Sequence, residues 1–529
     1  MENWGTVTLV DDTLTGAGAT GDDGAEAPAR PVAGEPDGRI GWFHRVPPRM
    51  WLAATLVVAF VVRVVNINGN GFNSDEAVYA GQAASLAGNP LFTQQFPVFR
   101  AHPLLLPVLL SPLFGSGTPD VVARLVVVAM GVATVFGVYL IGRELFGWRT
   151  GVLGALVLAL MPYHVGVTRQ LLLDGPATLC ITFAFWMFAR FVRTRSWAWL
   201  AASAATLGLG VLTKETSIVV AGAMVVFIVL APAVRRPLRT SAVFLGVTVA
   251  VSLTFPVVMS LAGRKSTGQS YLAWQLTRTS THAAGFYFTA VPAAIGWLVV
   301  AVALAGLLFR ANWNWRVALL VCWVAVPVLF FEFYPLKGFQ YLLPVAPAMA
   351  LLAARSLLTW HLPARLRMGD GRAARPVVVG VVLASMLVGT WATVFPTTSN
   401  AVLAGGGGIA GGREAGRWID EHLVPGTELL TIGPSMGNIL AYYGHRPAQG
   451  LSVSADPLHR NPSYWPVYNA DLSIHQGQFS YLVWDAYSAY RSPTTAKRLQ
   501  VLVATHHGIP VHEVRIGGKP IIVIYEVHP

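Results

Sequence analysis

Long apolar runs follow one another through most of the first 400 residues, and they leave few folds open to the chain. A helix needs roughly 20 mostly apolar residues to cross a bilayer, and we place about eleven such runs, or up to about thirteen if short and proline-interrupted segments are counted differently. They lie at 50–67, 120–141, 151–166, 175–192, 197–213, 216–233, 241–261, 286–309, 316–333, 339–360 and 376–396. The sequence therefore predicts an all-α polytopic membrane protein.

The composition supports this prediction. Hydrophobic residues make up 54% of the 529 residues and charged residues 12%, whereas soluble proteins are about 25% charged. The formal net charge of +12 could indicate nucleic-acid binding in a soluble protein. Here the basic residues are mainly arginines in short clusters between apolar runs, as the positive-inside rule produces. We expect a bilayer as partner and no nucleic acid.

The arginine clusters predict the orientation of the chain in a plasma membrane. Residues 1–44 are polar and rich in Gly, Ala and Asp, which is typical of a disordered tail. If this tail is cytoplasmic, the arginine-rich loops fall inside, and a domain 45–396 crosses the membrane an odd number of times. The C-terminal part is then extracytoplasmic.

The pattern changes after a glycine-rich linker at 397–412. Residues 413–422 predict an amphipathic helix, and 428–432, 481–484 and 520–525 predict strands. Residues 413–529 thus form a soluble α/β domain. Gly433–Gly437 lacks the lysine of a phosphate loop, and we interpret it and His506–His507 as turns.

Two adjacent acids, Asp75 and Glu76, follow the first apolar run, with Tyr79 one helical turn further on. Carboxylates at a membrane surface are costly and ask for a functional explanation. Either could act as a general base. The alternative is a helix cap, because Asn73-Ser74-Asp75-Glu76 is also good capping sequence.

Further charged residues fall at helix ends on the predicted outer side. Asp174 could join the acids or could pair with Arg169. Lys214 and Lys337 suit lipid-borne phosphate, although lysines at helix ends also snorkel to headgroups. His102 could orient a substrate or bind a metal, or it could be an ordinary loop residue.

The ordered motifs resemble those of the GT-C superfamily of polyprenyl-phosphate-sugar glycosyltransferases, particularly the protein O-mannosyltransferase and aminoarabinose lipid A transferase branch. The resemblance covers about residues 50–360. Its motifs are Asp75-Glu76, His102-Pro103, Arg143-Glu144-Leu145-Phe146-Gly147, Arg169 with Leu173-Asp174, Leu212-Thr213-Lys214, and Lys337 with Tyr341-Leu342-Leu343-Pro344.

The resemblance implies a GT-C fold, with Asp75 as the catalytic base, assisted by Glu76 and Asp174. It implies that Lys214, Lys337, Arg169 and Tyr341 bind the donor phosphate and that Tyr79, His102 and Gln340 contact substrate. Many relatives have Arg where Gln340 stands, so Arg169, Arg264 or Arg278 could supply that charge. We expect no required metal, although a divalent cation could bind the acids and His102.

The expected function is therefore inverting transfer of a sugar from a polyprenyl-phosphate carrier to a cell-envelope glycan, lipid or protein outside the membrane. One alternative is a lipid-linked-sugar transporter or flippase, which would need charges at mid-membrane depth and repeat symmetry. Another is a non-catalytic protein that binds envelope glycans.

Overall fold

The structure, a computed structural model, describes residues 46–97, 102–115, 120–261, 275–277, 280, 282–308, 313–359, 374–394 and 409–529. The predicted tail at 1–44, most of the predicted linker at 397–412, and the two arginines Arg264 and Arg278 lie outside these residues.

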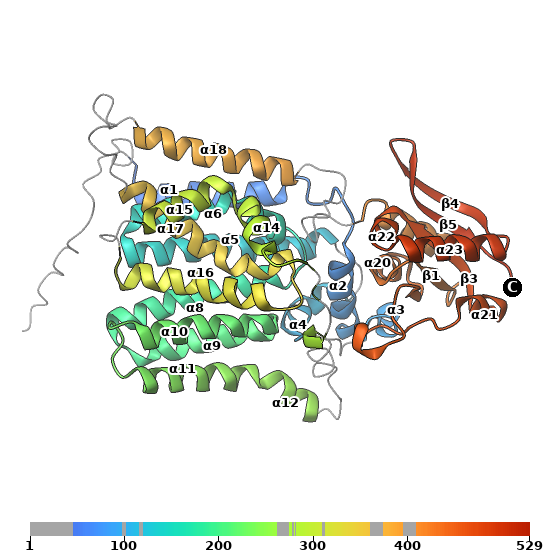
Figure 1. The fold of residues 1–529 in the computed structure, drawn as a ribbon, viewed down its shortest axis with the longest axis horizontal. Coiled ribbons are helices and arrows are strands. Elements are labelled where there is room, and N and C mark those ends of the chain that lie inside the picture. Colours follow the sequence, from blue (N-terminus) through green and yellow to red (C-terminus); the bar gives the residue numbers. More distant parts are fainter. Residues whose placement is uncertain are drawn as a thin grey trace, which may run out of the picture. The chain divides into compact units, whose positions relative to one another are not determined.

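Helices form the described part of the chain up to residue 394. Figure 1 shows the longer helices α5, α8, α9, α11 and α16 running alongside one another. The elements are α1 (Pro48–Val64), α2 (Ser74–Leu86), α3 (Pro90–Thr93), α4 (Leu105–Leu110), η1 (Ser111–Leu113), α5 (Asp120–Phe146), α6 (Trp148–Leu160), α7 (Pro162–Thr168), α8 (Asp174–Thr194), α9 (Trp197–Thr213), η2 (Glu215–Ser217), α10 (Ile218–Leu230), α11 (Pro237–Ser252), α12 (Thr254–Leu261), α14 (Phe286–Ile295), α15 (Trp297–Leu307), α16 (Trp315–Phe333), η4 (Phe339–Val345), α17 (Ala346–Thr359) and α18 (Ala374–Val394).

Several of these helices are long and apolar enough to cross a membrane. Within the described residues they are five segments, Asp120–Phe146, Asp174–Thr194, Pro237–Leu261, Trp315–Phe333 and Phe339–Thr359. The number rises to seven if each of two bent helix pairs is one span, and three shorter apolar helices accompany them. A multi-pass helical membrane protein is thus confirmed, while the predicted number of spans stays a prediction.

Two runs predicted as straight spans are bent in the structure. The run 151–166 divides into α6 and α7, which meet at 63°, and 286–309 divides into α14 and α15, which meet at 105°. Pro162 begins α7 and cannot donate the backbone hydrogen bond that would continue α6. Gly296 separates α14 from α15 with a φ of 103°, which favours glycine.

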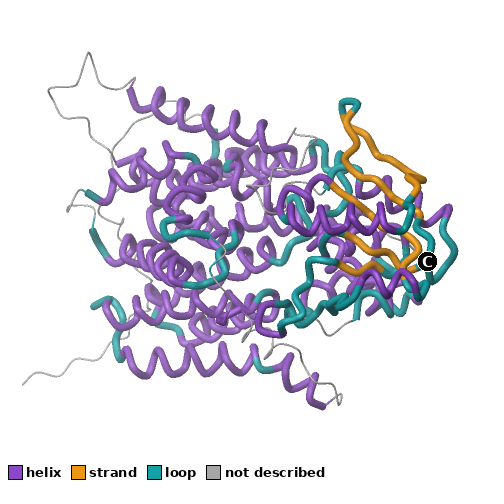
Figure 2. The backbone as a smooth tube through the Cα atoms, turned by 45° about the vertical axis from the view of Figure 1, so that its right-hand side comes forward, coloured by secondary structure: helices purple, strands orange, loops and turns teal. Residues whose placement is uncertain are grey.

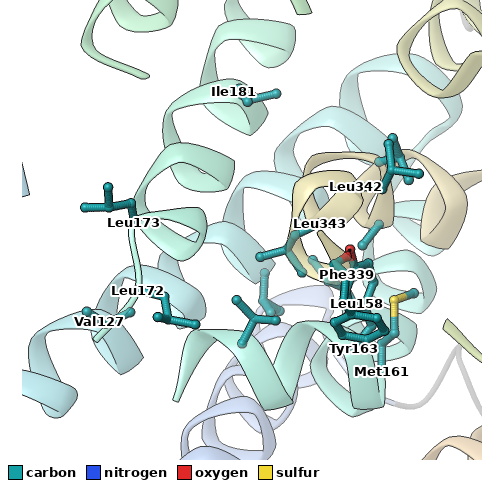
Figure 3. Close-up of a cluster of buried hydrophobic side chains, with 14 of the residues drawn as sticks. Val127, Leu158, Met161, Tyr163, Leu172, Leu173, Ile181, Phe339, Leu342 and Leu343 are labelled. Carbon is teal, nitrogen blue, oxygen red and sulfur yellow. Dashed lines mark hydrogen bonds between the residues drawn. The ribbon is translucent and has the colours of Figure 1, made fainter. Parts of the chain in front are cut away.

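Both bends lie against a buried core that also carries the segments of the candidate site. In Figure 3, Val127 of α5 lies beside Leu172, and Leu158 of α6 and Tyr163 of α7 gather with Phe339 of η4 in the same buried cluster. The Tyr163 hydroxyl donates a hydrogen bond to the Phe339 carbonyl. Packing therefore fixes the backbone that leads into Asp174 and the backbone that carries Tyr341.

The C-terminal part holds the five described strands, drawn in orange in Figure 2. Its elements are α19 (Gly412–His422), β1 (Glu428–Thr431), α20 (Pro434–Gly444), β2 (Ala448–Gly450), η6 (Pro457–His459), α21 (Ala470–His475), β3 (Phe479–Asp485), α22 (Ala486–Arg491), α23 (Pro493–Thr505), β4 (Ile509–Ile516) and β5 (Lys519–Glu526). The strand order is β2-β1-β3-β5-β4. Strand β1 pairs in parallel with β2 and β3, and the β3–β5 and β4–β5 pairs are antiparallel.

The predicted helix and three predicted strands of this domain correspond to α19, β1, β3 and β5. Strands β2 and β4 were not predicted. Strand β2 has three residues, too few to show a pattern, and β4 is an edge strand whose residues are mostly exposed. Neither presents the alternating apolar face by which a strand is recognised.

A buried acid at the end of β3 gives this domain a pH-dependent stability. Asp485 is fully buried, and burial raises the pKa of its carboxyl to about 6. Its Oδ1 accepts a hydrogen bond from the Ser488 N–H at 2.7 Å, while Oδ2 has no partner among the described residues. Ionising this group therefore costs the folded state more than the unfolded chain.

We expect Asp485→Asn to stabilise the protein by up to about 3 kcal/mol above pH 7. The folded pKa lies above the unfolded value, so the cost of the charge is absent below about pH 4 and grows as pH rises through about 6. Thermal unfolding between pH 4 and 8 measures the effect, with Glu421→Gln at an exposed position on α19 as control. A stability gain that is equal at every pH would contradict this explanation.

Candidate active site

The N-terminus of α2 is a complete capping box that separates the roles of the two adjacent acids. Asn73 Oδ1 accepts hydrogen bonds from the backbone N–H groups of Asp75 and Glu76, each at 2.9 Å. In return, Glu76 Oε2 accepts one from the Asn73 N–H at 3.0 Å. Asn73 and Glu76 therefore form the helix cap that the sequence offered as an alternative. The Asp75 side chain takes no part in this cap and is exposed to solvent.

Glu76 is fully buried, and its carboxylate is occupied by protein groups. Arg124 of α5 donates to both of its oxygens, at 2.8 and 2.7 Å. The Leu171 N–H donates to Oε1 at 2.8 Å. An acid with these partners holds α2, α5 and the loop before α8 together. This geometry favours a structural role for Glu76 over the predicted catalytic one. The sequence did not indicate this role, because Arg124 lies 48 residues away from Glu76 along the chain.

We expect Glu76→Gln to lower the free energy of unfolding by about 3 kcal/mol or more, because it leaves the buried Arg124 guanidinium without its counter-charge. The midpoint of thermal unfolding in detergent measures this loss. Glu513→Gln, at an exposed position on β4, is the control. An unchanged midpoint with lost activity would return Glu76 to a catalytic role.

Asp75 lies within electrostatic reach of a group of charged residues from distant parts of the chain. This acid–lysine cluster comprises Asp75, His102, Asp174, Lys214 and Glu215. Lys214 Nζ lies 2.7 Å from Asp174 Oδ1, and both side chains are buried. His102 Nδ1 lies 2.9 Å from Glu215 Oε2.

Two aromatic rings border the cluster. Lys214 Nζ lies 4.5 Å from the centroid of the Tyr341 ring, which is a cation–π contact. The Tyr79 ring faces His102 edge-on, with 6.3 Å between the ring centroids. The structure thus brings the predicted residues Asp75, Tyr79, His102, Asp174, Lys214 and Tyr341 into one neighbourhood.

The charges of the cluster act on one another. The surrounding protein removes water from the Asp75 carboxyl and so raises its pKa above the ordinary value. The nearby His102 and Lys214 limit this rise through their positive charge. Burial alone would lower the pKa of His102, but the Glu215 carboxylate raises it overall. The positive charge that His102 and Lys214 can place near Asp75 therefore favours its ionised form, the form that a general base requires.

Three other predicted residues lie in different surroundings. Lys337 is buried, with Nζ 2.9 Å from Glu332 Oε1 and 3.2 Å from the Ala283 carbonyl. Arg169 donates to the carbonyls of Val65 and Val394, at 2.6 and 3.2 Å. These contacts give both cations protein partners.

Gln340, the third of these residues, is half-buried next to Tyr341. Its Oε1 is buried and has no hydrogen-bond partner among the residues that the structure describes. Lys337 and Gln340 share one segment with Tyr341, so this segment connects the Glu332 pair to the acid–lysine cluster.

The sequence did not single out Glu215 as a site residue, yet it is the partner of His102. The position of Glu215 directly after Lys214 is the sequence feature that could have indicated its place in the site. Glu332 was likewise missed as the partner of Lys337, five residues away.

The C-terminal domain contacts the loop that leads into Asp75. The Tyr443 hydroxyl of α20 accepts a hydrogen bond from the Phe72 N–H at 2.8 Å and donates one to Asp120. Asn438 Nδ2, also on α20, donates to Ser74 Oγ at 3.0 Å. The N-terminus of α2 is therefore positioned from both domains.

Comparison with known proteins shows what this arrangement of helices and charged side chains resembles. The family model for dolichyl-phosphate-mannose-protein mannosyltransferase matches residues 101–259. No curated protein sequence matches the chain.

The fold is shared with solved structures of other proteins. ArnT from Cupriavidus metallidurans bound to undecaprenyl phosphate is similar with a TM-score of 0.62 and 18% identity, over 92% of this chain and 98% of that one. The oligosaccharyltransferase AglB from Archaeoglobus fulgidus, in complex with an inhibitory peptide and a dolichol-phosphate, has a TM-score of 0.60 and 14% identity, over 88% and 73%. The fold that the sequence resemblance implies is thereby confirmed, because the chain shares the overall fold of these solved structures.

Proposed function

We propose that the protein is an inverting glycosyltransferase that moves a sugar from a polyprenyl-phosphate carrier to a cell-envelope acceptor outside the membrane. The observation that carries the proposal is the acid–lysine cluster, in which the buried Lys214–Asp174 pair lies within electrostatic reach of the exposed Asp75 carboxylate. Solved proteins with this fold hold undecaprenyl phosphate or dolichol-phosphate, which supports a carrier of that chemistry here.

In the proposed reaction, Asp75 accepts the proton of an acceptor hydroxyl. The acceptor oxygen then forms a bond to the anomeric carbon of the sugar. The bond from that carbon to the phosphate oxygen breaks on the opposite side, and the polyprenyl phosphate leaves with the electron pair. Lys214, near Tyr341, stabilises the charge that grows on the phosphate. Asp174 orients Lys214 through their 2.7 Å contact.

We propose that the reaction needs no metal ion, because protein cations already face the acids of the cluster. Asp174 is paired with Lys214, and Glu215 is paired with His102. A divalent cation would have to displace one of these partners to gain more than the single ligand Asp75. Lys214 can supply the positive charge at the phosphate instead.

The extracytoplasmic position of the site is part of the proposal and rests on the positive-inside rule. Arg143 lies at the opposite end of α5 from Asp120, with Arg149 nearby at the start of α6, and Arg190 and Arg193 lie at the opposite end of α8 from Asp174. If these arginines are cytoplasmic, the acid–lysine cluster and the C-terminal domain face outward.

Purified protein in lipid nanodiscs, incubated with a panel of polyprenyl-phosphate monosaccharides, tests the function. We expect release of polyprenyl phosphate from one donor, at a rate that EDTA leaves unchanged within about twofold. Loss of turnover in EDTA, restored by a divalent cation, would overturn the metal-independent mechanism. Passage of donors across the bilayer of sealed proteoliposomes, without turnover, would favour the flippase alternative.

A further inference from the structure

A cleft of about 360 Å³ lies next to the N-terminus of α2, on the side of the C-terminal domain. Helix α20, the backbone around β2 and the loop Ser463–Trp465 line it, together with Gln94 from the segment after α3. Its volume is within the range of about 300–1,000 Å³ that small-molecule sites occupy.

The lining of this cleft suits a neutral ligand with many hydroxyl groups. None of the described residues that line it carries a charge. Beside small apolar residues and Ser463, the lining holds amide and aromatic side chains: Gln94, Gln95, Asn438, Gln449, Tyr464 and Trp465. Amide side chains both donate and accept hydrogen bonds, and an indole offers a flat apolar face. Trp465 is 77% exposed, so its ring is open to a ligand. An anionic ligand would instead call for arginine or lysine.

A buried hydroxyl adds to this evidence. Ser463 Oγ lines the cleft and has no hydrogen-bond partner among the described residues. A buried polar atom of this kind is normally satisfied. A ligand hydroxyl in the cleft could satisfy it.

One side chain connects the cleft to the proposed base. Asn438 Nδ2 donates to the Tyr464 hydroxyl at 2.8 Å and to Ser74 Oγ at 3.0 Å. Ser74 is the first residue of α2 and directly precedes Asp75. A ligand held by Tyr464 and Trp465 is therefore held next to the helix end that carries Asp75.

We propose that the cleft binds the sugar units of a neutral saccharide acceptor and guides a hydroxyl of it towards Asp75. This inference rests on the proposed function, and it narrows the acceptor from any envelope component to a glycan. Trp465 is then a specificity-determining residue that contacts acceptor and not donor.

Saturation-transfer NMR on the donor-free protein tests binding directly. The probes are neutral glucose, mannose and galactose trisaccharides, a galacturonate trisaccharide, and a serine- and threonine-containing peptide. We expect signals from at least one neutral trisaccharide, reduced at least fivefold by Trp465→Ala and unchanged by Tyr490→Ala, which removes an exposed aromatic ring from α22. Binding of no saccharide, or equal binding by both variants, would overturn the proposal, as would Trp465-dependent binding of the peptide alone.

The outcome is separable from that of the proposed function. If the transferase function is correct and the cleft proposal is wrong, the wild type turns over donor and Trp465→Ala has an unchanged KM for acceptor. If the cleft proposal is correct, Trp465→Ala raises the KM for acceptor at least fivefold while slow donor hydrolysis without acceptor is unchanged. A protein that binds saccharide but turns over no donor would be a glycan-binding protein.

A second site is carried by a different observation, a cluster of metal-ligand types in the C-terminal domain. Asp471 and His475 lie one turn apart on α21, and His506 directly follows α23. One ligand atom from each lies within 4.8 Å of the other two. Three ligands of this kind are the protein contribution to many open zinc sites.

The surroundings of His506 favour a cation at this position. Its Nδ1 lies 3.3 Å from the His528 carbonyl, and its Nε2 lies 3.0 Å from Asp471 Oδ1. Both ring nitrogens therefore face oxygen acceptors, although a neutral imidazole has one N–H. A metal ion bound at Nε2, with the ring proton on Nδ1, satisfies this arrangement. A backbone carbonyl on the far nitrogen is the usual partner of a metal-bound histidine.

The geometry points to a Zn²⁺ site formed by Asp471, His475 and His506. Zinc–nitrogen distances of roughly 2.0–2.1 Å require the ligand atoms to be about 3.3 Å apart. The Asp471–His506 pair is already at 3.0 Å. His475 is exposed and its ring centroid is 4.8 Å from that of His506, so rotation of its side chain can complete the site.

Equilibrium dialysis of the purified full chain against buffered Zn²⁺, after stripping with EDTA, tests this site. We expect one equivalent bound by the wild type, at least tenfold weaker binding by His475→Ala and by Asp471→Asn, and unchanged binding by His507→Ala, an exposed neighbour. The visible spectrum of the Co²⁺ form reports the ligand geometry. No zinc in the wild type, or equal binding by all variants, would overturn the proposed site.

Discussion

Replacement of Asp75 by Asn lowers the rate of sugar transfer by about 10²–10⁴-fold, the usual contribution of a positioned general base. The amide has nearly the shape of the carboxylate but cannot accept the acceptor proton. The capping box does not use the Asp75 side chain, so the helix should begin as before. Initial rates at saturating donor and acceptor, together with donor binding to each variant, measure the effect.

Donor binding should be retained in Asp75→Asn, and Glu513→Gln on β4 should behave as the wild type. The pH profile gives a second check. The surrounding protein raises the pKa of the Asp75 carboxyl, so this group takes up a proton at a higher pH than an ordinary aspartate. As the pH is lowered, activity should therefore begin to fall at a higher pH than the titration of an ordinary aspartate would give. A variant that turns over normally would remove Asp75 from the mechanism, and one that loses donor binding together with turnover would make it a binding residue.

The sequence predicted the helical part of the fold because membrane helices are recognised by composition alone. Its failures are local. Whether α6 and α7 are straight or bent depends on what packs around Pro162, and prolines inside α14 and α16 do not divide those helices. The strands β2 and β4 were missed because one is short and the other lies at an exposed edge.

The sequence predicted which residues belong to the candidate site better than it predicted what each of them does. The order of acids and lysines along the chain was enough to group Asp75, Asp174 and Lys214. The sequence could not distinguish Asp75 from Glu76, because a catalytic acid pair and a capping box have the same letters. Their difference depends on Arg124 and on the Leu171 N–H, which only the folded chain brings to Glu76.

Replacement of Lys214 by Met lowers transfer by about 10²–10³-fold, the loss typical when one stabilising donor is removed from a developing charge. Methionine keeps most of the volume of lysine and removes the ammonium group beside Tyr341. We expect weaker binding of the donor as well, because the phosphate is charged before the reaction. Rates and donor affinity are measured in nanodiscs, with Lys497→Met on α23 as control.

This variant also leaves Asp174 buried without its 2.7 Å partner, so lost activity could reflect lost stability. The double variant Lys214→Met/Asp174→Asn separates the two causes, since it removes both charges. If Lys214 binds the phosphate, the double variant regains the midpoint of thermal unfolding and remains inactive. If the pair is a structural salt bridge, activity returns together with stability, and the cation that stabilises the leaving phosphate must be sought elsewhere, first at Lys337.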